Sequence, residues 1–247
     1  MKITIHHSSL FSFFSNTLYY LIAFPILKIV TKVVYDLKIE GVENIRNIDE
    51  PAISVSNHVL VLDCAMVGLA YGAKYVYYTT QQESFEIPFI KHLIDLLHAI
   101  PIPKNVHDKQ KFIEVINEIL QGKNHVHFYP EAVLEPYDEK IRHFKNGAFD
   151  FAVKNGVPIV PMVFCFREPR GIRKLFKRKK DVTLVVLEPI TCVDNSGDIK
   201  QMIESLKQKT YEKMNEVILR KKIGGNKNED INEGQICTTS DAGFGNE

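Results

Sequence analysis

The chain has 247 residues and a mass of 28.3 kDa, enough for one large domain or two small ones with a full hydrophobic core. Hydrophobic residues make up 45% and charged residues 25%, which excludes wholesale disorder and fibrous repeats. The 31 Lys and Arg residues balance the 30 Asp and Glu residues, so no overall basic field points to nucleic acid. The four cysteines form no C-x-x-C pair, which fits a reducing compartment.

The N-terminus carries a charge-free apolar stretch. No Lys, Arg, Asp or Glu occurs between Lys2 and Lys28, and residues 10–27 read LFSFFSNTLYYLIAFPIL. A helix needs about 20 residues to span the hydrocarbon core, so this stretch is at the limit. Pro25 is expected to kink or stop the helix near its end. The interspersed Ser, Asn and Thr favour an interfacial or shallowly inserted membrane helix, with a buried core helix as the alternative.

After residue 40, strand and helix signals alternate. We predict strands at 52–56, 75–79, 125–129, 158–166 and 182–187, and helices at 63–71, 85–97, 108–120, 147–154 and 198–222. This alternation predicts an α/β sandwich whose mostly parallel sheet is flanked by helices. The composition turns polar after Gly224–Gly225. We therefore expect an N-terminal membrane-associated helix (1–40), an α/β domain (41–223) and a disordered tail (224–247).

The candidate chemistry follows the first of these strands, where residues 57–63 read NHVLVLD. Five residues turn through about 500° on a helix, so His58 and Asp63 would not share a helical face, but a loop entering a helix can bring them together. Asp63 would then accept a hydrogen bond from one ring nitrogen of His58 and raise the basicity of the other. This is the His–Asp half of a Ser–His–Asp triad. The sequence has no G-x-S-x-G elbow, so the nucleophile is expected to be a substrate hydroxyl. A capping Asp beside a buried His is the alternative.

Two further patterns are open to more than one interpretation. His125 and His127 form an H-x-H pair on one face of a predicted strand, where they could bind a metal. Without an acidic or Cys partner at a telling distance, we favour a structural pair and predict no metal site. Residues 167–180 read REPRGIRKLFKRKK, a basic run with interleaved apolar residues. This pattern suits an anionic lipid surface, and no nucleic-acid recognition motif accompanies it.

Four blocks in order resemble the signature of the glycerolipid acyltransferases, the lysophosphatidic acid acyltransferase family. NHVLVLD resembles the N-H-x-x-x-x-D block, and AIPIPKN at 99–105 resembles the second block. FYPEAVLEP at 128–136 resembles the third, which reads F-P-E-G-T-R in the family. FKNGAF at 144–149 and VPIVPMVF at 157–164 resemble the downstream consensus and the fourth block. The agreement extends from about Gly41 to Ile190.

The resemblance implies roles for individual residues. His58 would be the general base and Asp63 its partner. Ala132, Val133 and Leu134 stand where the family has Gly-Thr-Arg, and Lys104 stands where an Arg is usual. Acceptor and phosphate binding is therefore assigned to Lys104, Glu131, Lys140, Arg142 and Lys145. Supporting roles fall to Asn57, Pro130, Gly147, Pro158 and Pro161.

The sequence thus predicts a membrane-associated O-acyltransferase without a cofactor, whose active site faces the cytoplasm. By resemblance it moves a fatty acyl group from acyl-CoA or acyl carrier protein to a lysophospholipid hydroxyl at a membrane. We expect 1-acylglycerol 3-phosphate as acceptor and phosphatidic acid as product. The alternatives are another lysolipid acceptor, a metal-dependent hydrolase built on His58, Asp63 and the His125/His127 pair, and a non-catalytic lipid-binding relative that has lost the acceptor site at 132–134.

Overall fold

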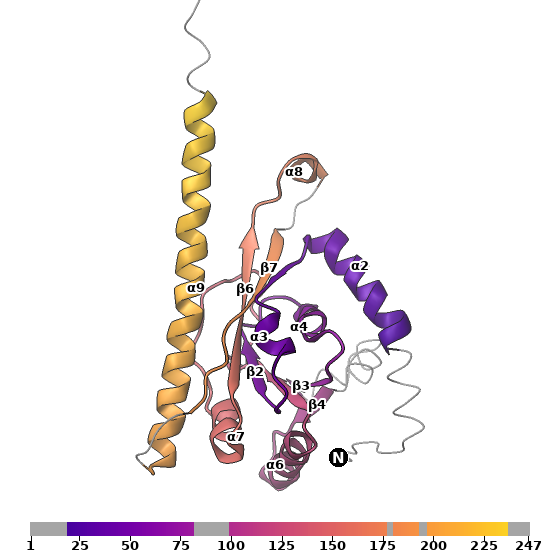
Figure 1. Cartoon of the computed structure of the whole chain (residues 1–247), viewed down its shortest axis with the longest axis vertical. Coiled ribbons are helices and arrows are strands. Elements are labelled where there is room, and N and C mark those ends of the chain that lie inside the picture. The colour runs from indigo at the N-terminus through magenta and orange to yellow at the C-terminus, as the bar shows by residue number, and fades with distance from the viewer. Residues whose placement is uncertain (1–18, 82–98, 177–179, 193–196, 237–247) are drawn as a thin grey trace, which may run out of the picture.

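The computed structural model describes residues 19–81, 99–176, 180–192 and 197–236 (Figure 1). These residues form a 7-stranded sheet of order β1-β7-β6-β2-β5-β3-β4. Neighbouring strands are parallel, except that β6 and β7 are antiparallel. The prediction of an α/β fold with a mostly parallel sheet flanked by helices is confirmed.

The elements follow one another in an α/β order. The strands are β1 (Lys38–Glu40), β2 (Ile53–Ser56), β3 (Val76–Gln81), β4 (Ala99–Ile102), β5 (His125–Phe128), β6 (Ile159–Arg167) and β7 (Asp181–Val186). A π-helical turn, η1 (Tyr19–Ala23), leads into α2 (Phe24–Tyr35). The other helices are α3 (Glu43–Arg46), α4 (Asp63–Tyr71), α6 (Val106–Gln121), α7 (Gly147–Asn155), α8 (Ile172–Phe176) and α9 (Ile199–Ile236).

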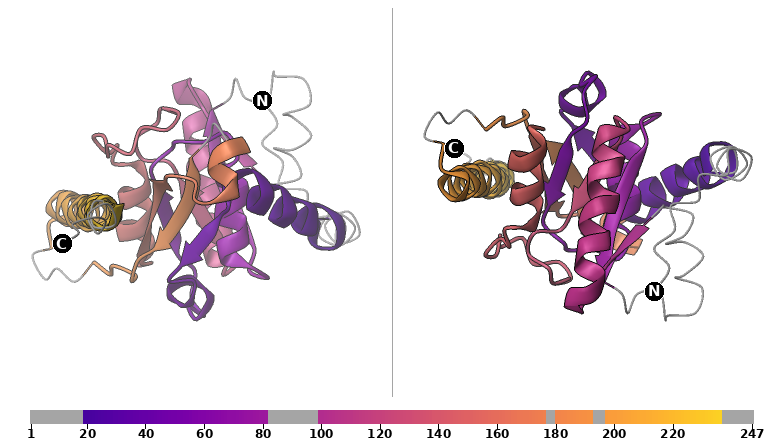
Figure 2. Two further views of the ribbon diagram at one scale, coloured as in Figure 1. Left: turned by 90° about the horizontal axis from the view of Figure 1, so that it is seen from above. Right: turned by 90° about the horizontal axis from the view of Figure 1, so that it is seen from below.

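Helices cover both faces of the sheet. Helices α6, α7 and α9 pack on one face, and α2, α3 and α4 pack on the other. Alternation along the strands produces these two layers, because successive side chains point to opposite faces. In β2, Ile53 and Val55 join the α6–α7–α9 core, whereas Ser54 contacts Tyr71 of α4. Helices α9 and α2 lie on opposite sides of the molecule (Figure 2).

Most of the elements expected from the sequence are present near their expected bounds. The predicted strands correspond to β2, β3, β5, β6 and β7, and the helix expected at 63–71 is α4. The helix predicted at 85–97 lies outside the described residues. Strands β1 and β4 and helices α3 and α8 were not predicted. Strand β4 tolerates Pro101 because it lies at the edge of the sheet, where a missing N–H leaves no partner unpaired.

The N-terminal helix differs from the expectation in one respect. Pro25 does not end a helix but is the second residue of α2, directly after the π-helical turn η1. Within the described ranges, no helix combines the length and the apolar character needed to cross a membrane. Residues 10–18 of the apolar stretch lie outside those ranges. Strand β1, whose residues fall in the segment 1–40 that we expected to be a membrane-associated helix, pairs with β7 in the sheet.

The C-terminal helix is longer than the sequence suggests. Helix α9 continues through Gly224–Gly225 to Ile236, into the segment expected to be a disordered tail. Glycine inside a helix costs about 1 kcal/mol without ending it, and both glycines here keep the helical conformation. Residues 237–247 lie outside the described part of the chain.

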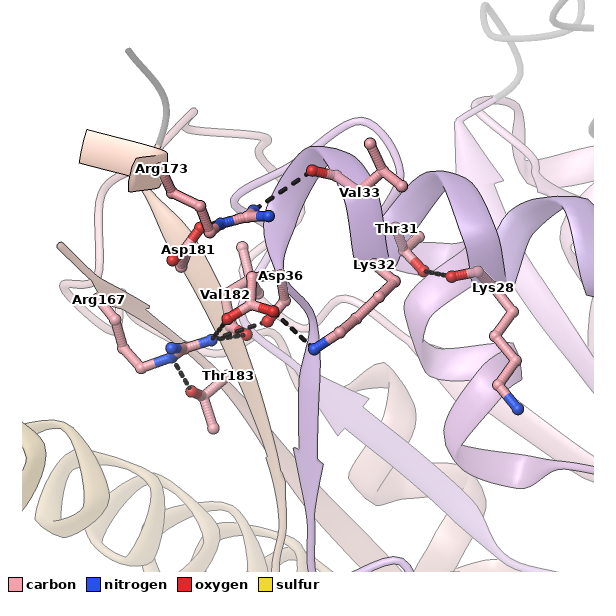
Figure 3. Close-up of polar contacts among 10 residues, drawn as sticks. All are labelled: Lys28, Thr31, Lys32, Val33, Asp36, Arg167, Arg173, Asp181, Val182 and Thr183. Atoms are coloured by element: carbon pink, nitrogen blue, oxygen red, sulfur yellow. Dashed lines mark hydrogen bonds and ion pairs between the residues drawn. The ribbon is translucent and has the colours of Figure 1, made fainter. Parts of the chain in front are cut away.

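Two arginines fasten the end of α2 to the sheet (Figure 3). Arg167 Nη2 donates to the carbonyl oxygen of Asp36 at 2.8 Å and to that of Val182 at 3.2 Å. Arg173 Nη2, from α8, donates to the carbonyl oxygen of Val33 at 3.3 Å and to Asp181 at 3.2 Å. Helix α2 is therefore positioned by β6, β7 and α8 together.

Candidate active site

The candidate site lies where two neighbouring strands end. Strands β2 and β5 are parallel, and Val55 is paired with Phe128. The residues that follow these two strands therefore meet at the carboxyl end of the sheet. His58 follows β2, Asp63 begins α4, and Tyr129 follows β5 directly. In open α/β sheets this carboxyl edge is where ligands bind.

His58 and Asp63 form a close pair. His58 Nδ1 lies 2.6 Å from Asp63 Oδ2, which makes Nδ1 the donor and leaves Nε2 as the basic nitrogen. The Asp63 side chain is 1% exposed, whereas that of His58 is 24% exposed. The carboxylate also sits at the N-terminus of α4, where a negative charge is stabilised by the helix dipole. The structure thus provides a buried acid that orients a partly exposed base.

Tyr129 completes this arrangement and was missed in the sequence. Its hydroxyl donates to Asp63 Oδ1 at 2.8 Å, and its ring stacks on the His58 imidazole with centroids 4.1 Å apart and planes at 25°. Burial and the nearby Asp63 carboxylate raise the pKa of Tyr129 well above its usual value, so the hydroxyl stays protonated. The available signal was its position, because Tyr129 occupies the Phe position of the family's F-P-E sequence.

A buried chain of hydrogen bonds lies next to the pair. Tyr71 Oη donates to Ser54 Oγ at 2.8 Å, and Ser54 Oγ lies 2.7 Å from His127 Nδ1. His127 Nε2 lies 3.2 Å from Ser56 Oγ, which donates to the carbonyl oxygen of Asn57 at 3.1 Å. These directions are consistent when His127 carries its proton on Nε2. Burial lowers the pKa of His127 to about 3, so the ring is neutral at physiological pH.

The H-x-H pair makes structural contacts. His125 Nδ1 accepts the backbone N–H of Ala52 at 3.2 Å, and burial lowers its pKa to about 4. Both nitrogens of His127 are engaged by serine hydroxyls. Among the residues that the structure describes, no group of three or more His, Cys, Asp or Glu side chains could hold a metal ion.

The residues that we expected to support the motifs hold the loops of the candidate site in place. The side chain of Asn57 makes two hydrogen bonds to the backbone of Phe164 in β6, at 3.1 and 2.8 Å. The remaining four contribute through the backbone. The carbonyl oxygen of Pro130 accepts from Lys145, that of Pro158 from Ile53 and that of Pro161 from Leu187, and Gly147 begins α7.

Glu131 and Arg142 lie together beside the pair. The Glu131 side chain is buried and accepts the backbone N–H of Arg142 at 3.3 Å, and burial raises its pKa. The Arg142 guanidinium lies 2.7 Å from Asp138 and 3.8 Å from both Glu131 and Glu135. The N–H of Glu135 donates to the His58 carbonyl oxygen at 3.0 Å, which holds this loop against the site. Three carboxylates therefore already surround Arg142.

The three candidate lysines are exposed. Lys140 and Lys145 lie on the loop that follows Glu131. Lys104 follows β4, three strands away from β2 in the sheet, so its backbone lies roughly 14 Å from the end of β2. Contact between Lys104 and an acceptor bound at His58 therefore depends on the lengths of both the side chain and the acceptor.

A separate apolar cavity of about 960 Å³ lies beside α2. Its lining includes Phe24 and Ile29 of α2 and Leu69, near the C-terminal end of α4. His58 and Asp63 are not among the lining residues and lie at the other end of α4.

Comparison with known proteins assigns the family. The family model described as Acyltransferase matches residues 36–165, a region that contains His58, Asp63, Tyr129 and Glu131. The chain belongs to this acyltransferase family. The family resemblance predicted from the four sequence blocks is therefore confirmed.

Curated relatives carry more specific names. A chloroplastic 1-acyl-sn-glycerol-3-phosphate acyltransferase, LPAT1 of Arabidopsis thaliana, is 31% identical over 132 residues, which cover 52% of this chain and 35% of that protein. A second, BAT2 of Brassica napus, is 28% identical over 163 residues, covering 63% and 45%. The match thus spans less than half the length of either relative. The crystal structure of the 1-acyl-sn-glycerophosphate acyltransferase PlsC from Thermotoga maritima has a TM-score of 0.49 at 19% identity, over 83% of this chain and 95% of that chain.

Proposed function

We propose that this acyltransferase moves a fatty acyl group from acyl-CoA or acyl carrier protein to the free hydroxyl of 1-acylglycerol 3-phosphate. The product would be phosphatidic acid, an intermediate of phospholipid biosynthesis. The names of the curated relatives support the acceptor, and the matched region contains the candidate catalytic pair. The single observation that carries the proposal is the 2.6 Å contact between His58 Nδ1 and Asp63, which leaves Nε2 available as a base.

The geometry suits general-base catalysis on a substrate hydroxyl. His58 Nε2 takes the proton of the acceptor hydroxyl while the hydroxyl oxygen attacks the thioester carbonyl carbon. Asp63 stabilises the imidazolium that forms, and backbone N–H groups of the surrounding loops stabilise the oxyanion. The C–S bond then breaks, and Nε2 returns the proton to the departing sulfur. One C–O bond forms, one thiol is released, and neither a metal ion nor a covalent enzyme intermediate is required.

Product analysis with two variants tests this proposal. Purified protein is given a panel of lysolipids with acyl-CoA or acyl carrier protein, and products are identified by mass. His58→Ala should lower the rate about 10²-fold to 10⁴-fold, and Asp63→Asn should lower it by a similar or smaller factor. His107→Ala, which removes an exposed histidine in α6, is the matched control and should keep the wild-type rate. Transfer by His58→Ala within a few-fold of wild type would disprove the mechanism.

The same assay separates the alternatives. Phosphatidic acid formation supports the proposed acceptor, whereas products from a different lysolipid would support a changed headgroup specificity. Lipid binding without any transfer would support the non-catalytic relative. Acyl hydrolysis that requires stoichiometric zinc or manganese would support the metal-dependent hydrolase.

We further propose that Lys104, rather than Arg142, binds the acceptor's phosphate. Lys104 follows β4 at the carboxyl end of the sheet, where His58 also lies, and it stands at the position of the basic residue in the family's second block. The Arg142 guanidinium, in contrast, faces three carboxylates of its own loop. Lys104→Ala should therefore raise the acceptor KM roughly 10-fold to 100-fold, the effect of a lost charge-assisted hydrogen bond, with little change in the donor KM. Arg142→Ala should mainly lower stability. Lys140→Ala and Lys145→Ala extend the comparison. A selective acceptor effect for Arg142→Ala and none for Lys104→Ala would reverse the assignment.

We propose, finally, that α2 and α8 form one membrane-contacting surface. Ile22 in η1 and Ile26, Ile29 and Val33 in α2 recur at helical spacing and are 52–65% exposed. On α8, Ile172 and Leu175 are 75% and 80% exposed, within the basic run. Figure 1 places α8 near the end of α2, and Arg173 connects the two (Figure 3). An apolar helical face beside cations is the pattern of interfacial binding to anionic lipids.

Vesicle sedimentation tests this surface. Ile29→Glu and Leu175→Glu should each weaken binding to anionic vesicles by about 10-fold or more. Each replaces an apolar side chain that would be buried in the lipid by a charged one. Leu219→Glu, at a 61% exposed position on α9, is the matched control and should bind as wild type does. Equal binding by all three variants would contradict the proposal. That the active site faces the cytoplasm stays a prediction.

A further inference from the structure

We propose that Tyr129 is a positioning residue for the catalytic base, holding Asp63 and the ring of His58 in one geometry. This inference rests on the proposed acyl transfer. It extends that proposal because the family's third block has Phe at this position, and a Phe side chain has no hydroxyl to donate to the carboxylate. The residue thus adds a third member to the His58–Asp63 pair.

The first argument concerns the carboxylate. Asp63 is buried, and its two oxygens have separate partners, with Oδ2 on His58 Nδ1 at 2.6 Å and Oδ1 on the Tyr129 hydroxyl at 2.8 Å. A buried carboxylate oxygen without a hydrogen bond is costly, so the hydrogen bond from the Tyr129 hydroxyl stabilises this particular side-chain rotamer of Asp63. With Oδ1 held, Oδ2 stays aimed at His58 Nδ1, which keeps Nε2 free to accept the proton.

The second argument concerns the ring of His58. It stacks on the ring of Tyr129, with ring centroids 4.1 Å apart and an angle of 25° between the planes. This stacking limits rotation of the imidazole. When His58 becomes an imidazolium during the reaction, the electron-rich face of Tyr129 attracts the new charge. Tyr129 therefore acts on both the orientation of the base and the stability of its protonated form.

The surroundings of His58 make this contribution distinguishable. Asp63 faces His58 from α4, and Tyr129 and the buried Glu131 face it from the segment after β5. The neutral ring of His127 packs edge-on against Tyr129, with ring centroids 4.7 Å apart. Among these groups, the Tyr129 hydroxyl is the uncharged donor that contacts Asp63 directly. Removing this hydroxyl leaves more of the carboxylate's negative charge on Oδ2, the oxygen that faces His58.

Steady-state kinetics of Tyr129→Phe and Tyr129→Leu provide the test. Tyr129→Phe keeps the ring and should lower kcat about 10-fold without changing either KM, the cost of one lost hydrogen bond to a charged group. The acidic limb of the kcat/KM profile should move to higher pH, because Asp63 then stabilises the imidazolium more strongly. Tyr129→Leu removes the stacking as well, so kcat should fall further and the limb should move back toward lower pH.

A matched control separates positioning from stability. Tyr71→Phe also removes a buried tyrosine hydrogen bond of 2.8 Å, but that bond ends on Ser54 and not on Asp63. It should lower the melting temperature as Tyr129→Phe does, yet keep the wild-type kcat and pH profile. Because Tyr129 is inferred to act through Asp63, Tyr129→Phe should cause no further loss in an Asp63→Asn background. A wild-type kcat and pH profile for Tyr129→Phe, an equal kcat loss for Tyr71→Phe, or additive losses in the double variant would overturn the inference.

One readout does not depend on turnover. The Nδ1 proton of His58, observed by NMR in protein labelled at histidine, should shift in Tyr129→Phe and keep its wild-type position in Tyr71→Phe. If the wild-type enzyme transfers no acyl group but this shift occurs, the proposed function fails while the positioning role stands. If the enzyme is active and the resonance does not move, the positioning role is wrong.

Discussion

Protonation of two buried histidines should make this fold sensitive to mild acid. Burial lowers the pKa of His127 to about 3 and that of His125 to about 4, from 6.5 in the unfolded chain. A lowered pKa in the folded state means that the unfolded chain binds the proton first. The stability contribution is therefore complete above pH 6.5 and is lost as the pH falls toward 4 and 3.

The size of the effect follows from these shifts. At pH 5 each ring is about 1.5 pH units below its unfolded pKa, which corresponds to about 2 kcal/mol per ring. Together the two rings should remove about 4 kcal/mol, a large part of the 5–15 kcal/mol that typically stabilises a domain. Glu131, whose pKa is raised by burial, works in the opposite direction and partly offsets this loss.

Urea unfolding at pH 7.5 and pH 5.0 measures this loss, and His127→Gln isolates one ring. The glutamine amide can still bond to Ser54 and Ser56 but does not titrate. Wild type should lose about 2 kcal/mol more than the variant between the two pH values, because every other titrating group is common to both proteins. An equal loss in the two proteins would refute the assignment of acid sensitivity to His127.

Three substitutions test backbone positions, two of them at the site and one, Gly41, after β1. Ala132 has a φ of 57°, so Ala132→Gly should raise the free energy of unfolding by about 0.5–1 kcal/mol, and an unchanged or lower melting temperature would contradict this. Gly41 has a φ of 74°, and a Cβ there would overlap the carbonyl oxygen of Val186, so Gly41→Ala should cost about 3 kcal/mol in denaturant unfolding. Asn57→Ala leaves two backbone groups of Phe164 without their side-chain partner and should cost about 2–3 kcal/mol, whereas a loss below about 0.5 kcal/mol would show that these bonds are replaced.

Local patterns predicted the elements that are stabilised by their own sequence. Asp63 to Tyr71 is apolar and followed by Gly72, and α4 has these bounds. Strand β1 has a single apolar residue between two charged ones, and β4 contains Pro101, so neither has the composition of a strand. Both are formed by pairing with neighbours that the sequence does not reveal. Pro25 could be interpreted as a helix stop or as a first-turn residue, and only the position of α2 decides between them.

The candidate site was predictable in part. The sequence indicated that His58 and Asp63 could meet, because a strand end entering a helix is a local arrangement, and the structure places them 2.6 Å apart. Tyr129 is 66 residues from Asp63 along the chain, so its contact depends on β2 and β5 being neighbours. The enclosure of Arg142 by carboxylates likewise depends on how the loop after β5 folds back on itself.

The departures from the family's third block change the charge of this loop more than its backbone. Ala132 keeps a left-handed backbone at the position where the family has Gly. Leu134 removes the arginine of the block, while Arg142 brings a guanidinium to within 3.8 Å of Glu131 from further along the chain. That guanidinium is paired with internal carboxylates, so it stabilises the buried acid instead of offering a free charge to a ligand. If the proposed acceptor is correct, its phosphate displaces those carboxylates or binds elsewhere at the carboxyl end of the sheet. Substitutions of Arg142 and Lys104 distinguish these two arrangements.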